Sequence, residues 1–211
     1  MKHFIFTVTA VVIITTVLKA QDFTKIRLGA KAGYNYSMSK FVTNKELQTK
    51  AISGGYAGAM LKIPFDGRLF FAPQIDINYR GMQTDSLQPN QFSSVKELQI
   101  RVMPLLQIDF KHPDEKINTL FVQFGPSLGF GVNGKQIKQN GANTPVKTNL
   151  KYGYQAYGMY DASWHTGFGY ETTKGFRVLI EYIHGLGNMI NTENGATLKY
   201  RGISAGIGYW F

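Results

Sequence analysis

The sequence predicts an all-β protein, folded as one antiparallel up-and-down β-barrel of about eight strands. Several stretches alternate strictly between apolar residues and small or polar residues, and the stretch at 199–211 is typical. The chain is also rich in residues that suit barrel walls, with 12 Tyr, 15 Phe and 23 Gly. Long polar segments and short turn-like segments connect the alternating stretches in turn. Because successive side chains of a strand point to opposite faces, the alternation indicates strands whose two faces meet different environments.

The first 20 residues have the pattern of a cleaved signal peptide. Lys2 and His3 precede an apolar run at 4–18, and a small residue allows cleavage between Ala20 and Gln21. A membrane-anchor helix is the alternative, but the run is shorter than the roughly 20 residues that span a bilayer. We therefore expect a signal peptide over 1–20 and one barrel domain over 21–211.

In the first half of the barrel, each expected strand has one face of Leu, Ile, Ala, Tyr or Phe. The opposite face carries glycine, amide or charged residues. These strands are expected at 26–37, 56–63, 69–80 and 97–111. Gly67 ends the turn between the second and third strands, because glycine adopts positive φ without steric cost.

The second half repeats this alternation, with strands expected at 120–133, 160–170, 176–182 and 199–211. Pro104 and Pro126 stand at apolar positions of their strands. Each predicts a bulge or local irregularity, because proline cannot donate a ladder hydrogen bond. Long polar loops are expected up to residue 50 and at 81–94, 134–149 and 185–196, with short turns at 64–67, 112–115 and 172–175.

The polar face of the strands decides between two kinds of barrel. A secreted, lipocalin-like barrel would turn its apolar face inward, whereas a membrane barrel turns it toward lipid. Here the polar face mixes glycines with charges of both signs, which suits the narrow interior of an eight-stranded barrel. We expect a paired network of charged residues in the lumen, made of Arg27, Lys31, Asp76, Arg80, Glu97, Arg101, Asp109, Asp161, His165, Arg177 and Glu181.

The rhythm of the connections and the charge predict the location. Long extracellular loops and short periplasmic turns are typical of bacterial outer-membrane barrels, and an even number of strands leaves both termini in the periplasm. The chain has no cysteine, which excludes disulfides, thiolate metal sites and an acylated lipoprotein cysteine. The net charge of +10 favours anionic lipid, lipopolysaccharide or surface polysaccharide as partners, rather than nucleic acid, in an exported protein.

These stretches resemble the PorT-like "porin family" outer-membrane β-barrel domain of Bacteroidetes. The matching pieces are GAKAGYNYS at 29–37, PQIDINYRG at 73–81, LQIRVMPLL at 98–106, GPSLG at 125–129, GFGY at 167–170, EYIHGLGN at 181–188 and GIGYWF at 206–211. The resemblance implies a fold and a location over nearly all of 21–211, and no activity. One branch of that family serves a secretion system, and nothing in this sequence singles out that branch.

Catalytic and metal-binding patterns are weak. Asp161, Ser163 and His165 share one strand face, but neighbours at this spacing lie about 6.5–7 Å apart, and the histidine does not stand between its partners. This pattern favours a hydrogen-bonded cluster in the lumen over a triad. His165 and His184 on separate strands are poor support for a metal site. We expect no catalytic residues, metal or cofactor.

The sequence thus predicts a non-enzymatic barrel whose extracellular loops bind a surface partner or lipid. Lysines expected in those loops could hold lipopolysaccharide phosphates or simply be solvated, and they are Lys40, Lys45, Lys50, Lys135, Lys138 and Lys147. A narrow pore, or an accessory of an outer-membrane secretion machine, is the first alternative. A barrel enzyme acting on lipid or peptide is the second.

Overall fold

The computed structural model describes residues 26–41, 48–85, 92–112, 115, 117–141, 143–153, 157–188 and 197–211. The predicted signal peptide at 1–20 and its cleavage site lie outside these residues, as does Lys45. No helix within the described ranges is long and apolar enough to cross a membrane.

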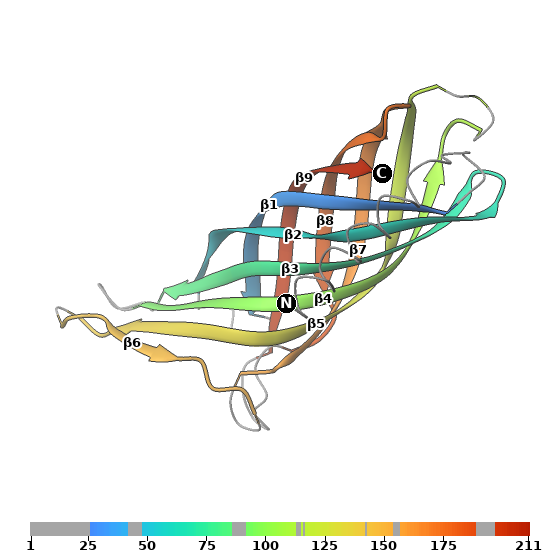
Figure 1. Cartoon of the computed structure of the whole chain (residues 1–211). Helices are drawn as coiled ribbons and strands as arrows, with labels where there is room; N and C mark the ends of the chain where they lie inside the picture. The colour runs from blue at the N-terminus through green and yellow to red at the C-terminus, as the bar shows by residue number, and fades with distance from the viewer. Residues whose placement is uncertain are drawn as a thin grey trace, which may run out of the picture.

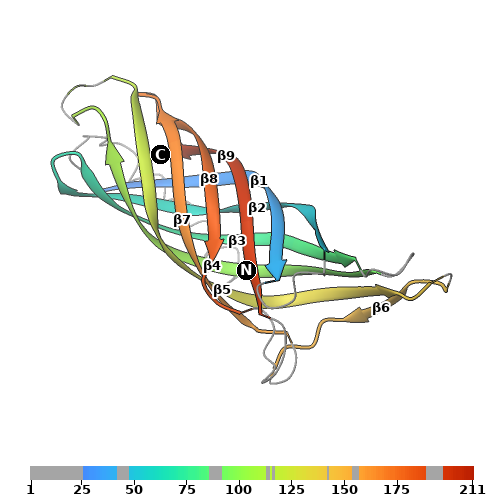
Figure 2. The ribbon, with the colours of Figure 1, turned by 180° about the vertical axis from the view of Figure 1, so that it is seen from behind.

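Eight strands form a closed ring. In chain order they are β1 (Arg27–Phe41), β2 (Gln48–Asp66), β3 (Leu69–Asp85), β4 (Phe92–Asp109), β5 (Thr119–Gln139), β7 (Tyr160–Glu171), β8 (Phe176–Gly185) and β9 (Leu198–Trp210). Each pairs antiparallel with its neighbour, and β1 closes the ring against β9. The views from the front and from behind show the continuous wall (Figures 1 and 2). The predicted all-β antiparallel barrel is therefore confirmed.

The ninth strand, β6 (Val146–Asn149), stands outside the ring. It pairs only with the end of β5, from Lys135 with Asn149 to Lys138 with Val146. The resulting hairpin projects beyond the barrel wall at one end (Figure 1). The short connections β2–β3, β4–β5 and β7–β8 lie at the other end, near the C-terminus (Figure 1). We call these the hairpin end and the turn end.

Several strands are longer than the alternation predicts. β2 begins at residue 48 and not at 56, β3 continues to 85, and β5 continues to 139. The segment at 134–149, expected as a loop, instead holds the end of β5 and all of β6. Past the apolar wall both faces of a strand meet water, so the alternation fades while backbone pairing between neighbours continues.

The outer face of the barrel wall is apolar, as contact with lipid requires, and the inner face is polar. Large apolar side chains point outward, and Ile77, Ile180 and Ile207 are each more than half exposed. The opposite face points into the ring, where Asn78, Gln107 and Gln123 are fully buried. An eight-stranded ring leaves room only for side chains inside, so the polar residues pack against one another.

Prolines interrupt one pair of strands, as the sequence predicts. β4 and β5 pair up to Val102 with Leu128 and again from Leu106 with Phe124. Pro104 and Pro126 lie between these two stretches. The tight turn between β2 and β3 also follows expectation, because Gly67 has a φ of 50°.

Candidate functional site

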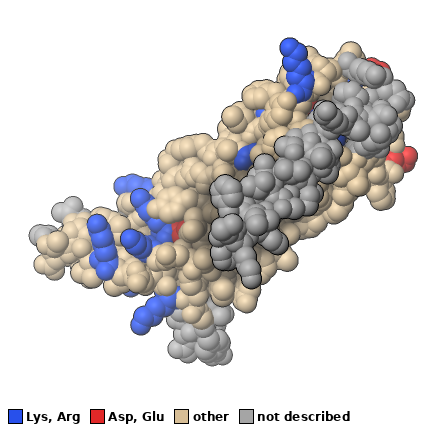
Figure 3. Space-filling model, viewed as in Figure 1, with Lys and Arg blue, Asp and Glu red and all other residues tan. Residues whose placement is uncertain are grey.

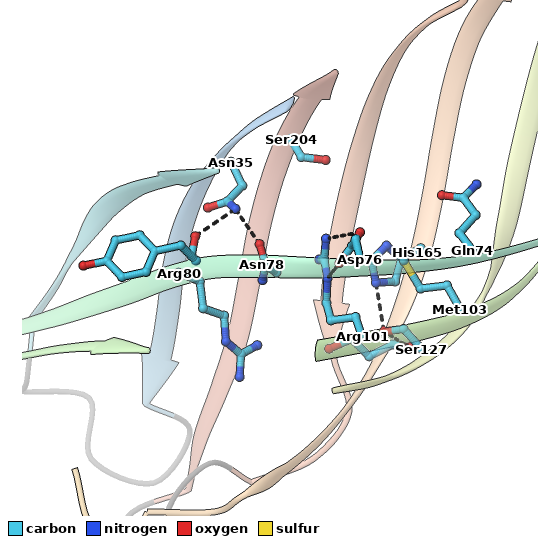
Figure 4. A network of polar contacts seen from close by, with 12 residues as sticks. Asn35, Gln74, Asp76, Asn78, Arg80, Arg101, Met103, Ser127, His165 and Ser204 are labelled. Carbon is cyan, nitrogen blue, oxygen red and sulfur yellow. Dashed lines mark hydrogen bonds and ion pairs between the residues drawn. The ribbon is translucent and has the colours of Figure 1, made fainter. Parts of the chain in front are cut away.

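The centre of the lumen holds a group of charges brought together by β1, β3 and β4. Arg101 Nε and Nη2 donate to the two carboxylate oxygens of Asp76 at 2.8 and 2.9 Å. Lys31 Nζ lies 2.8 Å from Asp76 Oδ2. Lys31 reaches across β2 because Gly58 occupies the intervening position, where an added Cβ would lie 2.5 Å from the Asp76 Cβ. Figure 4 shows Arg101 and Asp76 facing each other inside the ring.

Amide side chains extend this group across the lumen. Lys31 donates to Gln74 at 2.6 Å, and Gln74 donates to Gln123 at 3.2 Å. Gln123 then donates to Glu181 at 3.0 Å and accepts from Arg177 at 3.0 Å. The predicted lumen network contained no amide residues, although the alternation places these amides on the lumen face.

A second group closes the hairpin end of the lumen. Arg80 donates to Glu97 and to Asp161, at 2.6 Å in each case. Its guanidinium carbon lies 4.3 Å from the centre of the Tyr200 ring. Tyr152, in the segment after β6, places its hydroxyl 3.5 Å from Glu97. Burial, followed by the Glu97 charge, raises the pKa of Tyr152 from 10.0 to about 12.

A third group lies at the turn end. Lys62 Nζ is 2.6 Å from Asp109 and 3.2 Å from Glu171, and Arg27 is 2.5 Å from Glu171. The guanidinium carbon of Arg27 also lies 5.3 Å from the centre of the Trp210 ring. Lys62 and Glu171 were not among the predicted lumen residues. Continuing the alternation one position beyond Tyr170 would have placed Glu171 on the lumen face.

The eleven lumen residues named from the sequence are all buried. The structure divides them among these three groups along the barrel. Buried charges are costly unless they are paired, and in the described residues each of the carboxylates Asp76, Asp109 and Glu171 has a cationic partner. Ion pairs between buried side chains therefore occur in the centre and at the turn end of the lumen.

His165 contacts Ser127 on the neighbouring strand, and not Asp161 or Ser163 on its own strand. Its Nε2 lies 2.9 Å from Ser127 Oγ, and its Nδ1 lies 3.4 Å from Glu181. Ser163 instead donates to Asp161 at 3.2 Å, so Asp161, Ser163 and His165 do not form a triad. Figure 4 shows His165 directed at Ser127 on the neighbouring strand β5.

The order Ser127, His165, Glu181 is that of a catalytic triad. Ser127 Oγ lies within hydrogen-bond distance of both His165 Nε2, at 2.9 Å, and the Ser163 carbonyl oxygen, at 3.4 Å. All three side chains are almost completely buried. The arrangement links strands β5, β7 and β8 inside the lumen.

Metal-ligating groups do not gather among the described residues, where no cluster of three or more His, Asp or Glu side chains is found. His165 points into the lumen, whereas His184 lies opposite Trp164 on the outward face of β8. The two histidines therefore do not share a site.

The profile of the outer membrane protein beta-barrel domain family matches residues 19–191. The chain belongs to that family. This outer-membrane barrel is also similar in structure to Ail, the attachment invasion locus protein of Yersinia pestis, at 12% identity and a TM-score of 0.48, covering 89% of this chain and 99% of that chain. OprG from Pseudomonas aeruginosa gives 10% identity, a TM-score of 0.47 and coverage of 89% and 97%. Neisserial surface protein A gives 10% identity, a TM-score of 0.45 and coverage of 87% and 97%.

No curated protein sequence matches the chain significantly. The family match and the apolar outer wall agree that the protein resides in the outer membrane. The matched residues end before β9, the strand that closes this outer-membrane barrel against β1.

The lysines expected in loops lie on strands. Lys40 is near the end of β1, Lys50 is near the start of β2, and Lys135 and Lys138 are on β5. Lys147 is on β6. These lysines are exposed. They form two separate basic surfaces at the hairpin end, because three strands lie between β1 and β5 in either direction around the ring.

Proposed function

We propose that this protein is a non-enzymatic outer-membrane anchor whose β5–β6 hairpin binds an anionic partner at the cell surface. In this proposal the lumen is sealed, the hairpin end faces outward and both termini are periplasmic. We further assign the chain to the PorT-like "porin family" group, on the motifs quoted above.

The observation that carries the proposal is the charge of the hairpin. Lys135, Lys138 and Lys147 are exposed on two paired strands beyond the ring. Lys96 pairs with Lys135 on the adjoining strand β4 and adds a fourth cation. Within the described part of the chain, no carboxylate forms an ion pair with these lysines. Figure 3 shows Lys and Arg side chains gathered mostly toward this end. Such a surface attracts a polyanion.

The filled lumen supports an anchor over a pore. A continuous water path would need unpaired charges in the lumen, but four central charges have partners. Arg101 contacts Asp76, Asp109 contacts Lys62, and Arg177 and Glu181 both contact Gln123. An ion crossing this lumen would have to displace several paired buried charges, which is costly.

Two measurements on the refolded protein test the role. In a planar bilayer we expect a heat-modifiable barrel without stable current steps, and reproducible steps would overturn the sealed lumen.

Dextran sulfate should bind, and neutral dextran should not. Replacing Lys135, Lys138 and Lys147 by Gln should weaken dextran sulfate binding about tenfold, since each exposed charge contributes up to about 0.5 kcal/mol. The matched control, Lys111→Gln with Lys174→Gln at the turn end, should leave binding unchanged. Equal affinity of the hairpin variant and the unaltered protein would refute the hairpin site.

The orientation is tested separately, because the chain has no cysteine of its own. Asn143→Cys places a thiol at the tip of the hairpin, and Lys174→Cys places one in the β7–β8 turn. A membrane-impermeant maleimide should label intact cells at position 143 only, and both positions after lysis. Labelling of position 174 on intact cells would reverse the proposed orientation.

A further inference from the structure

A basic groove lies on the barrel wall at the hairpin end, on the side away from β5. It has a volume of about 640 Å³, and its lining includes Tyr36, Met38, Lys40, Lys50 and Arg201. The groove forms where β1 and β2 separate, because their regular pairing ends at Ser37 with Ile52. β9 continues along β1 on the other side, where Arg201 lies opposite Met38 and Lys199 opposite Lys40.

Three cations at or beside the groove form no ion pair with a described carboxylate. Among the residues that the structure describes, no ion pair is formed by Lys40, Lys199 or Arg201. The Nε of Arg201 is buried and has no hydrogen-bond partner. A guanidinium N–H that is shielded from water and unpaired is costly unless a ligand accepts from it. An anion at this groove would supply the missing acceptor.

An apolar groove runs along the same strands nearer the middle of the barrel. It has a volume of about 540 Å³ and is lined by Ala32, Phe168, Ile180, Ala205 and Ile207, among others. The hollow exists because alanines and glycines of β1 and β9 lie beside the larger side chains of β8 and β7, in the strand order β1, β9, β8, β7. Ile180 and Ile207 are 63% and 56% exposed, so this surface faces the bilayer core.

The two grooves are aligned on β1 and β9. Arg201 and Ala205 are four residues apart on β9, roughly 13 Å at the usual rise of about 3.3 Å per residue. Tyr36 lines the basic groove, and Tyr34, two positions along β1, lies opposite Ala205. Tyrosines at this level are typical of the membrane–water boundary. The basic groove is therefore at headgroup depth, and the apolar groove is at acyl-chain depth.

We propose that this paired groove binds one phosphorylated membrane lipid, with the phosphate held by Arg201 and Lys40 and an acyl chain in the apolar hollow. Arginine can donate two hydrogen bonds to one phosphate, and the lysine adds charge. The site lies across the ring from the β5–β6 hairpin. It requires only that the barrel is in the outer membrane, so it stands apart from the proposed hairpin partner.

Native mass spectrometry of the barrel released into mild detergent tests the proposal. Bis-phosphorylated lipid A, dephosphorylated lipid A, phosphatidylglycerol and inorganic phosphate are each titrated separately. We expect one phosphorylated lipid to be retained at least about tenfold more tightly than dephosphorylated lipid A. Preference for lipid A or for phosphatidylglycerol names the source, and either result supports the site. Binding of inorganic phosphate as tight as that of the lipids would overturn the acyl-chain part.

Variants locate the binding. Lys40→Gln with Arg201→Gln should weaken retention about tenfold, and Ala205→Trp, which fills the apolar hollow, should also weaken it. Arg201→Lys should retain part of the lipid binding, because it keeps the positive charge but loses the paired hydrogen bonds of the guanidinium. The matched control, Lys135→Gln with Lys138→Gln on the far side of the ring, should retain lipid fully. Unchanged lipid retention in the Lys40, Arg201 and Ala205 variants would refute the site. Dextran sulfate binding should be unchanged in the same variants, which would show that the lipid site and the hairpin site are independent.

Discussion

Arg101 holds Asp76 through two parallel hydrogen bonds, and the two residues face each other directly across β3 and β4. Both side chains are almost completely buried. Bidentate contacts of this kind are among the strongest that a carboxylate can make. The pair therefore fixes the register of two strands at the centre of the barrel while it neutralises a charge in the lumen.

Arg101→Leu should destabilise the barrel by about 3–5 kcal/mol, because it leaves Asp76 buried with only Lys31 as a cationic partner. The free energy of unfolding can be measured by urea titration of the protein in lipid vesicles. An unchanged unfolding midpoint would contradict the paired network. The control is Lys111→Gln, which removes an exposed partner of Glu115 at 4.0 Å. That change should alter stability by less than about 1 kcal/mol.

Tyr152 should make the hairpin end sensitive to alkaline pH. In the folded protein the pKa of Tyr152 is raised from 10.0 to about 12, chiefly by burial. The neutral phenol therefore stabilises the folded loop fully below pH 10, and this stabilisation is lost as the pH rises from 10 to about 12. The difference in tyrosinate absorbance between the unaltered protein and Tyr152→Phe should show a step above pH 11. A step near 10 would mean that the hydroxyl is solvated.

Ser127 should not react as a nucleophile, despite its contact with His165. A fluorophosphonate that labels activated serines should leave the folded barrel unmodified, because the Ser127 side chain is almost completely buried and the reagent cannot reach it. Labelling is read by intact-protein mass spectrometry, with Ser127→Ala as the control. A label that appears in the unaltered protein and disappears in Ser127→Ala would restore the enzyme hypothesis.

The alternation in the sequence was enough to predict the barrel wall. It works wherever one face of a strand meets lipid and the other meets the lumen, as in the β4 segment around Ile100 and Arg101. It fails past that zone, and the hairpin of β5 and β6 was therefore expected as a loop. Backbone pairing extends these strands, but where both faces meet water the sequence does not alternate between apolar and polar residues.

The pairing of lumen residues could not be predicted from alternation. Which carboxylate meets which cation depends on strand register and on the stagger of the ring, and a strand face specifies neither. Glycines add to the problem, because Gly58 allows Lys31 to reach past β2 to Asp76. The partner of His165 was mistaken for a neighbour on its own strand, whereas Ser127 comes from the adjoining strand.

The seam between β1 and β9 joins the two ends of the described chain, from Gly29 with Trp210 to Phe41 with Leu198. Contacts between residues so distant in sequence form slowly, because a long loop must close before they are gained. Until β9 pairs with β1, both strands have unpaired edges that lipid cannot satisfy and that can join another chain. Closure of this seam is therefore coupled to insertion of the barrel into the bilayer.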